Sequence, residues 1–258
     1  MRRNTNRLNP PRRQRETGFF DEPSGGAARR TANPMNSFPK IRALTLDVGG
    51  TLIRPWPSVG TVYARVAARH GLVVDPGMLH QHFAAAWRQA GEFHYSREEW
   101  ARLVDFTFTA CGEPPVGESL FAEIYDEFRE PRVWQVFDDT RPALEALSAA
   151  GFSLGVISNW DDRLRPLLER LGLDNYFETL VISCEVGFTK PSPVIFAHAA
   201  RMLGVPPGQI LHVGDCATRD VAGARNAGFQ AVHLARSGHD ASPAGIPTLG
   251  ELAGLLGH

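Results

Sequence analysis

The alternation of strand-like and helix-like segments in the second half of the chain constrains the fold more than any other sequence feature. Short apolar runs such as FSLGVISN and QILHVGD alternate with segments whose apolar residues recur at helical spacing, such as SPVIFAHAARMLG. This alternation predicts a parallel sheet flanked by helices, with ligands bound at the carboxyl ends of the strands. The run IRALTLD, from residue 41, reads as an earlier strand of the same sheet. We therefore predict an α/β protein with a Rossmann-like core.

Residues 59–135 follow a different pattern. Four segments carry apolar residues at helical spacing and are separated by Gly or Pro, namely VGTVYARVAARHG, PGMLHQHFAAAWRQAG, SREEWARLVDFTFTACG and GESLFAEIYDEFRE. The predicted organisation is a core of residues 41–58 and 136–258, interrupted by an inserted α-helical cap at residues 59–135. An insertion at this point is well placed to close over the carboxyl edge of the sheet as a lid.

The first 40 residues differ from the rest in composition. They contain nine basic and three acidic residues, whereas the remainder carries a net charge of −7. They are rich in Arg, Pro, Gly and Asn and lack an apolar period, so we expect a disordered segment that adds nothing to the core. A basic tail without a folded scaffold gives little reason to expect nucleic-acid binding.

Several classes of protein are disfavoured by what the sequence lacks. It has no stretch of about 18 apolar residues that would span a membrane and no apolar region typical of a secretory signal. The three cysteines form no CxxC pair that would indicate zinc or a disulfide framework. We expect a cytoplasmic protein without a membrane or nucleic-acid partner, and the sequence leaves monomer and homodimer equally open.

Polar residues occur where the predicted strands end. Asp47 opens the turn DVGGTL after the first strand, Ser158 and Asn159 end a second strand, and Asp215 follows a later strand in GDCATRD. The carboxyl ends of parallel strands meet at one edge of a sheet, so these side chains are expected to lie close together. The sequence thus predicts a polar site at that edge.

Two further residues, Asp220 in GDCATRD and Lys190 in FTKPSP, complete the pattern, and Lys190 is one of only two lysines in the chain. Converging carboxylates repel one another unless a cation lies between them, and Mg²⁺ favours carboxylate, water and phosphate oxygens. A lysine and a serine hydroxyl suit the oxygens of a phosphoryl group. A carboxylate in such a site can attack phosphorus and form an aspartyl phosphate.

These motifs resemble the four motifs of the haloacid dehalogenase superfamily, from residue 41 onward, and the helical segment resembles the type-one cap of one of its subfamilies. The resemblance implies that Asp47 is the nucleophile and a metal ligand, that Gly49 offers its carbonyl to the metal, and that Thr51 orients the loop. It implies phosphate binding by Ser158, Asn159 and Lys190. It also implies that Asp215 binds Mg²⁺ directly and that Asp220 binds the ion or orients its waters. The stretches DVGGTL, GFTKPSP and VWQVFDDT resemble most the branch of eukaryotic haloacid dehalogenase-like domain-containing protein 3 and its bacterial relatives.

One position departs from the superfamily pattern. Phosphatases of the superfamily typically read DxDGT, and their second Asp protonates the leaving group, whereas this chain has Gly49 there. Such proton transfer contributes about 10²–10⁴-fold, or roughly 3–5 kcal/mol of barrier. We therefore expect a Mg²⁺-dependent phosphohydrolase for a small phosphorylated molecule, with weakened general acid catalysis and a preference for aryl or acyl phosphates. Four residues of the predicted cap are candidate substitutes for the acid: His94, His70, Glu92 and Arg65.

Other chemistries of the superfamily fit less well. Phosphonatases need a cap lysine, and residues 59–135 contain none. The 2-haloacid dehalogenases place an aromatic residue at the position of Gly49 and need no metal, whereas this chain keeps Asp215 and Asp220. A module that holds a phosphorylated ligand without turnover is the main alternative. Retention of Asp47 and Lys190 favours turnover, and loss of the acid favours binding.

Some residues have a structural interpretation beside the functional one. The aromatic residues of the predicted cap, Trp87, Phe93, Tyr95 and Trp100, would line a substrate pocket or, more commonly at helical spacing, pack in a core. His212 and His233 lie in predicted strands and are interpreted as packed core histidines.

Overall fold

The computed structural model describes residues 40–236 and 245–256. The predicted disordered segment, residues 1–40, lies outside the described residues except for Lys40. No helix within the described ranges is both long enough and apolar enough to cross a bilayer.

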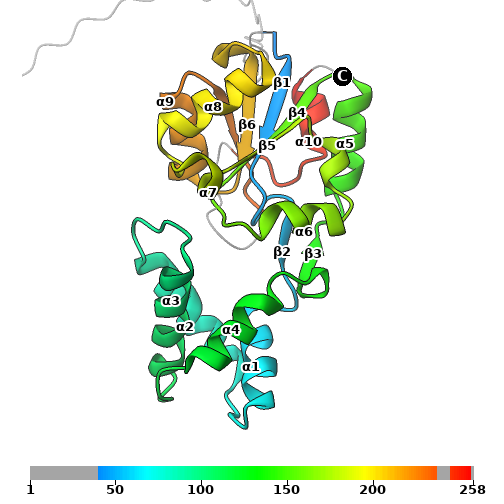
Figure 1. The fold of residues 1–258 in the computed structure, drawn as a ribbon. Coiled ribbons are helices and arrows are strands. Elements are labelled where there is room, and N and C mark those ends of the chain that lie inside the picture. The colour runs from blue at the N-terminus through cyan, green and yellow to red at the C-terminus, as the bar shows by residue number, and fades with distance from the viewer. Residues whose placement is uncertain (1–39, 237–244, 257–258) are drawn as a thin grey trace, which may run out of the picture. The chain divides into compact units, whose positions relative to one another are not determined.

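The core is a five-stranded sheet in which every neighbouring pair of strands is parallel (Figure 1). The strand order is β5-β4-β1-β6-β7, so the chain moves outward from β1 on one side and then crosses to the other side. The strands are β1 (Ala43–Leu46), β4 (Ser153–Ser158), β5 (Thr179–Ile182), β6 (Ile210–Gly214) and β7 (Gln230–His233). The predicted α/β fold is confirmed, and the reversal at β1 marks the edge where such sheets bind ligands.

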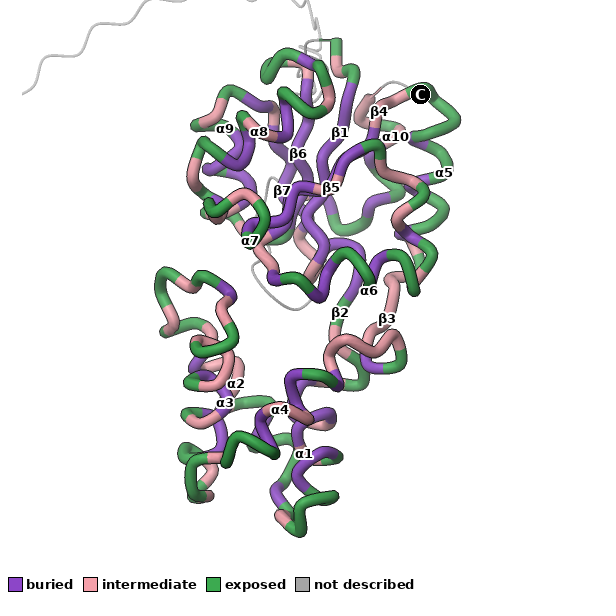
Figure 2. Tube along the Cα trace, viewed as in Figure 1, coloured by how far each residue is buried: buried purple, intermediate pink, exposed green. Residues whose placement is uncertain are grey.

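Helices cover both faces of the sheet. One apolar cluster joins the sheet to α5 (Thr140–Ala149), α6 (Leu164–Arg170) and α10 (Glu251–Leu255), and a second joins it to α8 (Pro193–Leu203) and α9 (Gly223–Asn226). Strand β1 serves both, because Leu44 and Leu46 belong to the first cluster and Ala43 to the second. Figure 2 shows the strands buried and the helices exposed on their outer sides. The short elements between them are α7 (Ser183–Val186), three 3₁₀ turns (Pro131–Val133, Asp174–Tyr176 and Pro207–Gln209) and a π-helical turn (Ala217–Ala222).

Four helices follow β1 in the chain and form what we call the helical insert, Val59–Glu127. They are α1 (Val59–Arg69), α2 (Pro76–Gln89), α3 (Arg97–Ala110) and α4 (Glu118–Glu127). Side chains cap three of them at the N-terminus: Ser58 accepts from the N–H of Thr61, Asp75 from that of Met78, and Ser96 forms a capping box with Glu99. The insert has an apolar cluster of its own, which includes Tyr63, Leu79, Phe108 and Ile124.

A small antiparallel pair of strands connects the sheet to the helical insert. It joins β2 (Ile53–Pro55) to β3 (Trp134–Val136). The sequence did not indicate these strands, since three residues are too few to show a period. The range 59–135 expected for the cap therefore ends inside β3 rather than in a loop.

Candidate active site

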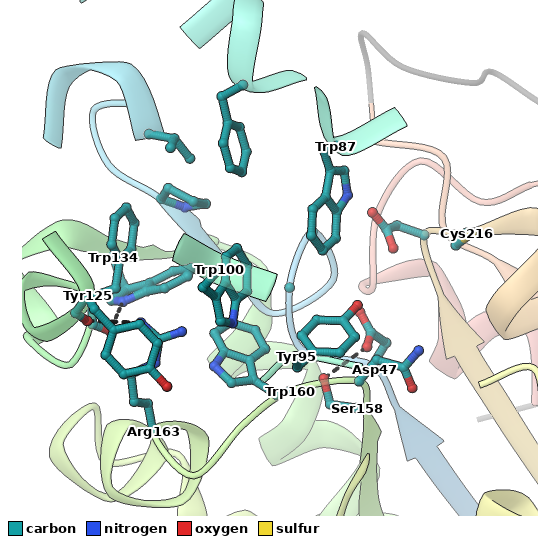
Figure 3. Close-up of a pocket in the computed structure, with 18 of the residues that line it drawn as sticks. Asp47, Trp87, Tyr95, Trp100, Tyr125, Trp134, Ser158, Trp160, Arg163 and Cys216 are labelled. Atoms are coloured by element: carbon teal, nitrogen blue, oxygen red, sulfur yellow. Dashed lines mark hydrogen bonds between the residues drawn. The ribbon is translucent and has the colours of Figure 1, made fainter. Parts of the chain in front are cut away.

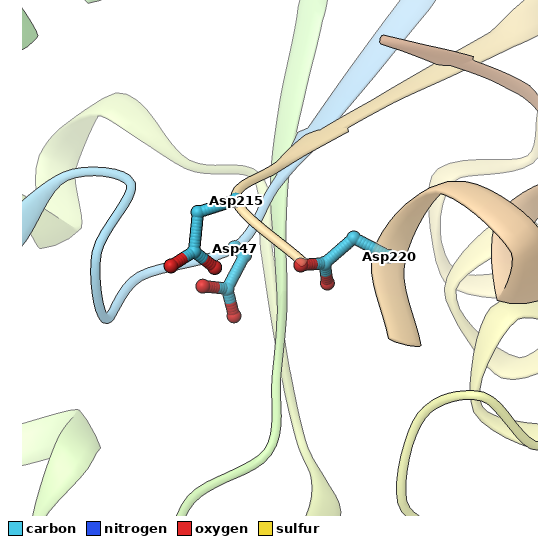
Figure 4. A group of neighbouring side chains, drawn as sticks. All are labelled: Asp47, Asp215 and Asp220. Atoms are coloured by element: carbon cyan, nitrogen blue, oxygen red, sulfur yellow. The ribbon is translucent and has the colours of Figure 1, made fainter. Parts of the chain in front are cut away.

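Three carboxylates gather at the carboxyl edge of the central strands. Asp47 follows β1, Asp215 follows the neighbouring β6, and Asp220 extends from the π-helical turn beyond it. Each offers an oxygen, and these oxygens lie within 4.8 Å of one another. Figure 4 shows the three carboxylates facing a common space. The sheet thus brings together the three acids that the sequence pattern predicts for one site.

Lys190 lies buried among these acids and is only 3% exposed. Its Nζ donates to Oδ1 of Asp47 at 2.7 Å, to Oδ1 of Asp220 at 2.6 Å and to the carbonyl of Ile157 at 2.8 Å. The ammonium group therefore uses all three donors within the protein. This fixes the position of the Asp47 carboxylate relative to Asp220.

The charges in the site are unevenly balanced. Burial alone would lower the pKa of Lys190, but the charges of Asp220 and Asp47 outweigh it and raise that pKa. Burial opposes ionisation of Asp220, yet Lys190 holds its pKa below the ordinary value. Burial, followed by repulsion from Asp47 and Asp220, raises the pKa of Asp215 to about 7. The side chain of Asp215 keeps an exposed surface although protein atoms surround much of it, so water screens part of this repulsion.

The second glycine of DVGGTL permits a close approach of the loop to Asp215. Gly50 has a φ of +82°, and a Cβ there would stand 2.2 Å from Oδ2 of Asp215. A side chain at position 50 would therefore clash with the carboxylate and strain the backbone. Glycine allows the loop after β1 to lie against the end of β6.

Two hydroxyl groups contact the Asp47 carboxylate. Ser158, the last residue of β4, donates from Oγ to Oδ1 at 3.2 Å. Thr51 donates from Oγ1 to Oδ2 at 3.4 Å. The motifs predict both residues for the site, and the fold brings both to the predicted nucleophile.

The side chain of Asn159 has a different set of partners from the one expected. Its Oδ1 accepts from the backbone N–H of Lys190 at 2.6 Å, and its Nδ2 donates to the backbone carbonyl of Lys190 at 3.0 Å. This paired contact holds the loop that carries Lys190. Both polar atoms of the Asn159 amide thus already have partners in the Lys190 backbone. Phosphate binding by this amide stays a prediction.

The histidines interpreted as core residues also support the acids. His212 is fully buried, with Nδ1 2.9 Å from Oγ1 of Thr45 and Nε2 3.3 Å from Oδ1 of Asp220. Burial lowers the pKa of His212, so the ring is neutral at pH 7. His233 donates from Nε2 to the carbonyl of Asp215 at 2.9 Å. The only sequence signal for these roles was their place in strands β6 and β7, beside the acidic loop.

A cavity of about 270 Å³ opens onto the acids between the helical insert and the core. Figure 3 shows aromatic rings gathered around it, with Asp47 and Ser158 at one end. Four of the five tryptophans of the chain line it. They are joined by Tyr95 and Tyr125, so that the aromatic wall includes Trp87, Trp100, Trp134, Trp160, Tyr95 and Tyr125.

The aromatic residues of the insert therefore both pack together and face the cavity. Trp87 and Trp100 are stacked at 5.7 Å between ring centroids, and Phe93 contacts both rings. Tyr95 has a φ of +64°, a conformation that costs a bulky residue of order 1–3 kcal/mol and that the packed rings around it maintain. Burial raises the pKa of Tyr95 to about 12, so its hydroxyl is protonated at neutral pH.

The proposed substitutes for the missing acid do not meet this cavity. Among the described residues that line it, none of the four candidates appears. His94 contacts Glu99, and His70 contacts Glu123 at 2.7 Å. Arg65 lies 4.0 Å from Glu127. All four candidate residues are exposed, and these three have partners within the insert rather than at the cavity.

An aromatic ring borders the position of the missing acid. A Cβ on Gly49 would stand 3.1 Å from Cζ3 of Trp160. Trp160 is anchored through its backbone, whose N–H donates to Oγ of Ser183 and whose carbonyl accepts from the same hydroxyl, both at 3.0 Å. A side chain at position 49 would require this ring to shift.

Comparison with known families identifies the class of protein to which this fold and site belong. The family model described as haloacid dehalogenase-like hydrolase matches residues 41–228, which include the helical insert and most of the sheet. The chain belongs to this family of hydrolases, as its four motifs predicted.

Individual proteins of known sequence or structure are also similar to this chain. The chain is 32% identical to haloacid dehalogenase-like hydrolase domain-containing protein 3 of Danio rerio over 235 residues, or 84% of this chain and 97% of the relative. A glyceraldehyde 3-phosphate phosphatase of Methanopyrus kandleri is 39% identical over 106 residues, 39% of this chain and 43% of the relative. A HAD (haloacid dehalogenase) phosphatase from Thermococcus onnurineus has a similar structure, with a TM-score of 0.62 and 27% identity over 84% of this chain and 98% of that one.

Proposed function

We propose that this protein is a Mg²⁺-dependent phosphohydrolase that acts on a small phosphorylated molecule through an aspartyl phosphate on Asp47. The contact that carries the proposal is the one between Lys190 and Asp47, made within a cluster of three carboxylates. A site that bound phosphate without a metal ion and without turnover would not need a buried carboxylate in the lining of the cavity. Similarity to proteins named as phosphatases supports the same reaction.

The donor set suits a magnesium ion. Asp47 and Asp215 would supply carboxylates to the ion. The backbone carbonyl of Gly49, in the same loop as Asp47, would supply a further oxygen. Burial and then the negative charges of Asp47 and Asp220 raise the pKa of Asp215, and a cation would offset those charges. Asp220 is engaged by Lys190 and by the N–H of Cys216, so we assign it mainly to orientation of its neighbours. When bound, Mg²⁺ would supply positive charge to the phosphoryl oxygens.

The residues around Asp47 divide the remaining tasks. Lys190 and Ser158 both donate to Oδ1, which fixes the direction in which the carboxylate presents its oxygens. A bond from Asp47 to phosphorus forms as the bond to the leaving group breaks, and water then cleaves the aspartyl phosphate. The positive charge of Lys190 lies beside the developing negative charge. The helical insert acts as a cap whose rings exclude water from the cavity.

A second function is favoured by one observation, the ring of Trp160 beside Gly49. A site in which a ring borders the place of the general acid suits a binding or regulatory module that holds a phosphorylated ligand without turnover. This alternative predicts binding of Mg²⁺ and a phosphate ligand with no release of product.

The deciding experiment is release of nitrophenol from 4-nitrophenyl phosphate, with Mg²⁺ and with chelator. We expect metal-dependent turnover that Asp47→Asn abolishes. The matched control is Asp138→Asn, the same change at an exposed residue; it should leave turnover unaltered. Absence of turnover in the unmodified protein, with Mg²⁺ binding intact, would establish the binding module instead.

A further inference from the structure

The wall of the cavity is aromatic on both sides of the site. Trp87 and Trp100 come from helices α2 and α3 of the helical insert, while Trp134 and Trp160 come from β3 and the loop after β4 (Figure 3). The ring centroids of Trp134 and Trp160 lie 5.2 Å apart. A ligand in the cavity therefore meets tryptophan from the insert and from the core.

The polar groups of two of these tryptophans are already satisfied by the protein. Nε1 of Trp100 donates to Asp161 at 2.9 Å, and Nε1 of Trp134 donates to the carbonyl of Phe128 at 3.1 Å. Arg163, also in the lining, is paired with Asp161 at 2.6 Å. With these groups paired, this part of the wall presents mainly ring surface to the ligand.

The chemistry at Gly49 points to the same kind of ligand. Without an acid at this position, the leaving oxygen has to depart as an anion, and Trp160 borders the place where an acid would stand. A phenol has a pKa of about 10, far below the value of about 15.7 for water, which alcohols approach. A phenolate leaves without protonation much more readily than an alkoxide does.

We infer that the cavity takes a small aryl phosphate, a phosphate monoester of a phenol, with its ring against the tryptophans and its phosphate at Asp47. This inference rests on the proposed function and names its substrate class. The cavity lies near the lower limit of about 300–1,000 Å³ typical of ligand sites, which suits a small aryl group.

The reaction balances without an added reagent. Asp47 forms a bond to phosphorus, and the bond from phosphorus to the aryl oxygen breaks, with its electron pair on the phenolate. Water then attacks phosphorus, releases the Asp47 carboxylate and supplies the proton that the phenolate takes up. The products are a phenol and inorganic phosphate.

The test measures binding of phosphonates that cannot be hydrolysed. Phenylphosphonate, cyclohexylphosphonate and methylphosphonate are titrated into the full-length protein with Mg²⁺ by calorimetry. Offset-stacked rings add enough free energy for a preference of about two- to twelve-fold. We therefore expect phenylphosphonate to bind about two- to twelve-fold more tightly than cyclohexylphosphonate, and both to bind more tightly than methylphosphonate.

Variants test which tryptophan causes the preference for phenylphosphonate over cyclohexylphosphonate. Trp160→Leu should remove it, whereas Trp56→Leu, the same change at the tryptophan outside the cavity, should retain it. Trp160→Phe keeps a ring and should keep most of the preference, which guards against loss of fold in the leucine variant. Equal affinity for the phenyl and cyclohexyl compounds, or for all three, would overturn the assignment of an aryl substrate.

Acetyl phosphate separates this inference from the function on which it rests. It has a good leaving group and no ring, so a phosphohydrolase should cleave it in an Asp47-dependent manner. Cleavage of acetyl phosphate without any aryl preference would overturn only the substrate class. No cleavage of acetyl or phenyl phosphate would overturn the proposed function.

Discussion

Lys190 places its Nζ 2.7 Å from Oδ1 of Asp47, although 143 residues separate the two in the chain. The same nitrogen contacts Asp220 at 2.6 Å, so one cation holds two of the three acids. Asp215, the third, lies at the exposed side of the group. The cluster thus consists of a buried pair of acids fixed by lysine and one acid that faces the cavity and solvent.

Replacing Lys190 should therefore affect both stability and activity. Lys190→Met would leave Asp47 and Asp220 buried without their cation, and breaking such a pair costs about 3–5 kcal/mol. We expect a loss of that order in the free energy of unfolding in urea at pH 7, together with loss of phosphatase activity. Lys40→Met is the control, because Lys40 is exposed. An unfolding free energy within about 1 kcal/mol of the unmodified protein would contradict the buried pairing.

The raised pKa of Asp215 predicts a pH-dependent effect in metal-free protein. Its folded value of about 7 lies above the ordinary value of 3.8, so the folded state binds this proton more tightly and loses stability as pH rises through that interval. Asp215→Asn should raise the melting temperature at pH 8 and have little effect near pH 4. Allowing for screening by water, we expect Asp215→Asn to raise the free energy of unfolding at pH 8 by about 1 kcal/mol and the melting temperature by roughly 2–4 °C.

The reference for that experiment is the same pair of proteins with Mg²⁺. Bound cation should stabilise the unmodified protein at pH 8 more than the asparagine variant, because the variant has lost one carboxylate ligand. A variant that melts below the unmodified protein at pH 8 in the presence of chelator would contradict a pKa of Asp215 raised by burial and by its acidic neighbours. Scanning calorimetry between pH 4 and 8 provides both comparisons.

Much of the fold and the acidic cluster follows from local sequence patterns. Apolar runs of strand length and periodic helical segments are visible over a few residues, and strand ends identify one edge of a parallel sheet. For that reason the sequence alone predicts that Asp47, Ser158 and Asp215 lie close together. The order of the motifs and the glycine turn after Asp47 also predict the family to which the chain belongs.

The contacts that the sequence did not reveal join residues far apart in the chain. Thr45 and His212 are 167 residues apart, and Asn159 and Lys190 are 31 apart. Neither pair has a local signature, because the contact depends on how strands are ordered in the sheet. The approach of Trp160 to Gly49 is of the same kind. The sequence showed that an acid was missing but not what stood beside it.

The contact between Trp160 and Gly49 alters what restoring the acid would achieve. Gly49→Asp supplies the missing carboxylate, but its Cβ meets the Trp160 ring at 3.1 Å. We expect Gly49→Asp with Trp160→Leu to raise kcat/KM on an alkyl phosphate by about 10²-fold, the lower end of general acid catalysis, and Gly49→Asp alone to raise it less. Gly49→Ala adds the Cβ without the acid and should give no gain. An equal gain from alanine would rule out proton transfer as the cause.

The paired contact of Asn159 with the Lys190 backbone distinguishes two roles for this asparagine. If it positions the lysine loop, Asn159→Ala should lower kcat with little change in KM and should destabilise the fold by about 1–3 kcal/mol, because two hydrogen bonds to the Lys190 backbone are lost. If its amide binds phosphate, KM should rise instead. Asn159→Asp keeps the acceptor for the Lys190 N–H but sets a carboxylate oxygen, which cannot donate, against the Lys190 carbonyl, so its kcat should fall as well. Steady-state kinetics on 4-nitrophenyl phosphate and urea unfolding of the three proteins separate these outcomes, and a rise in KM without loss of stability would assign Asn159 to the phosphate.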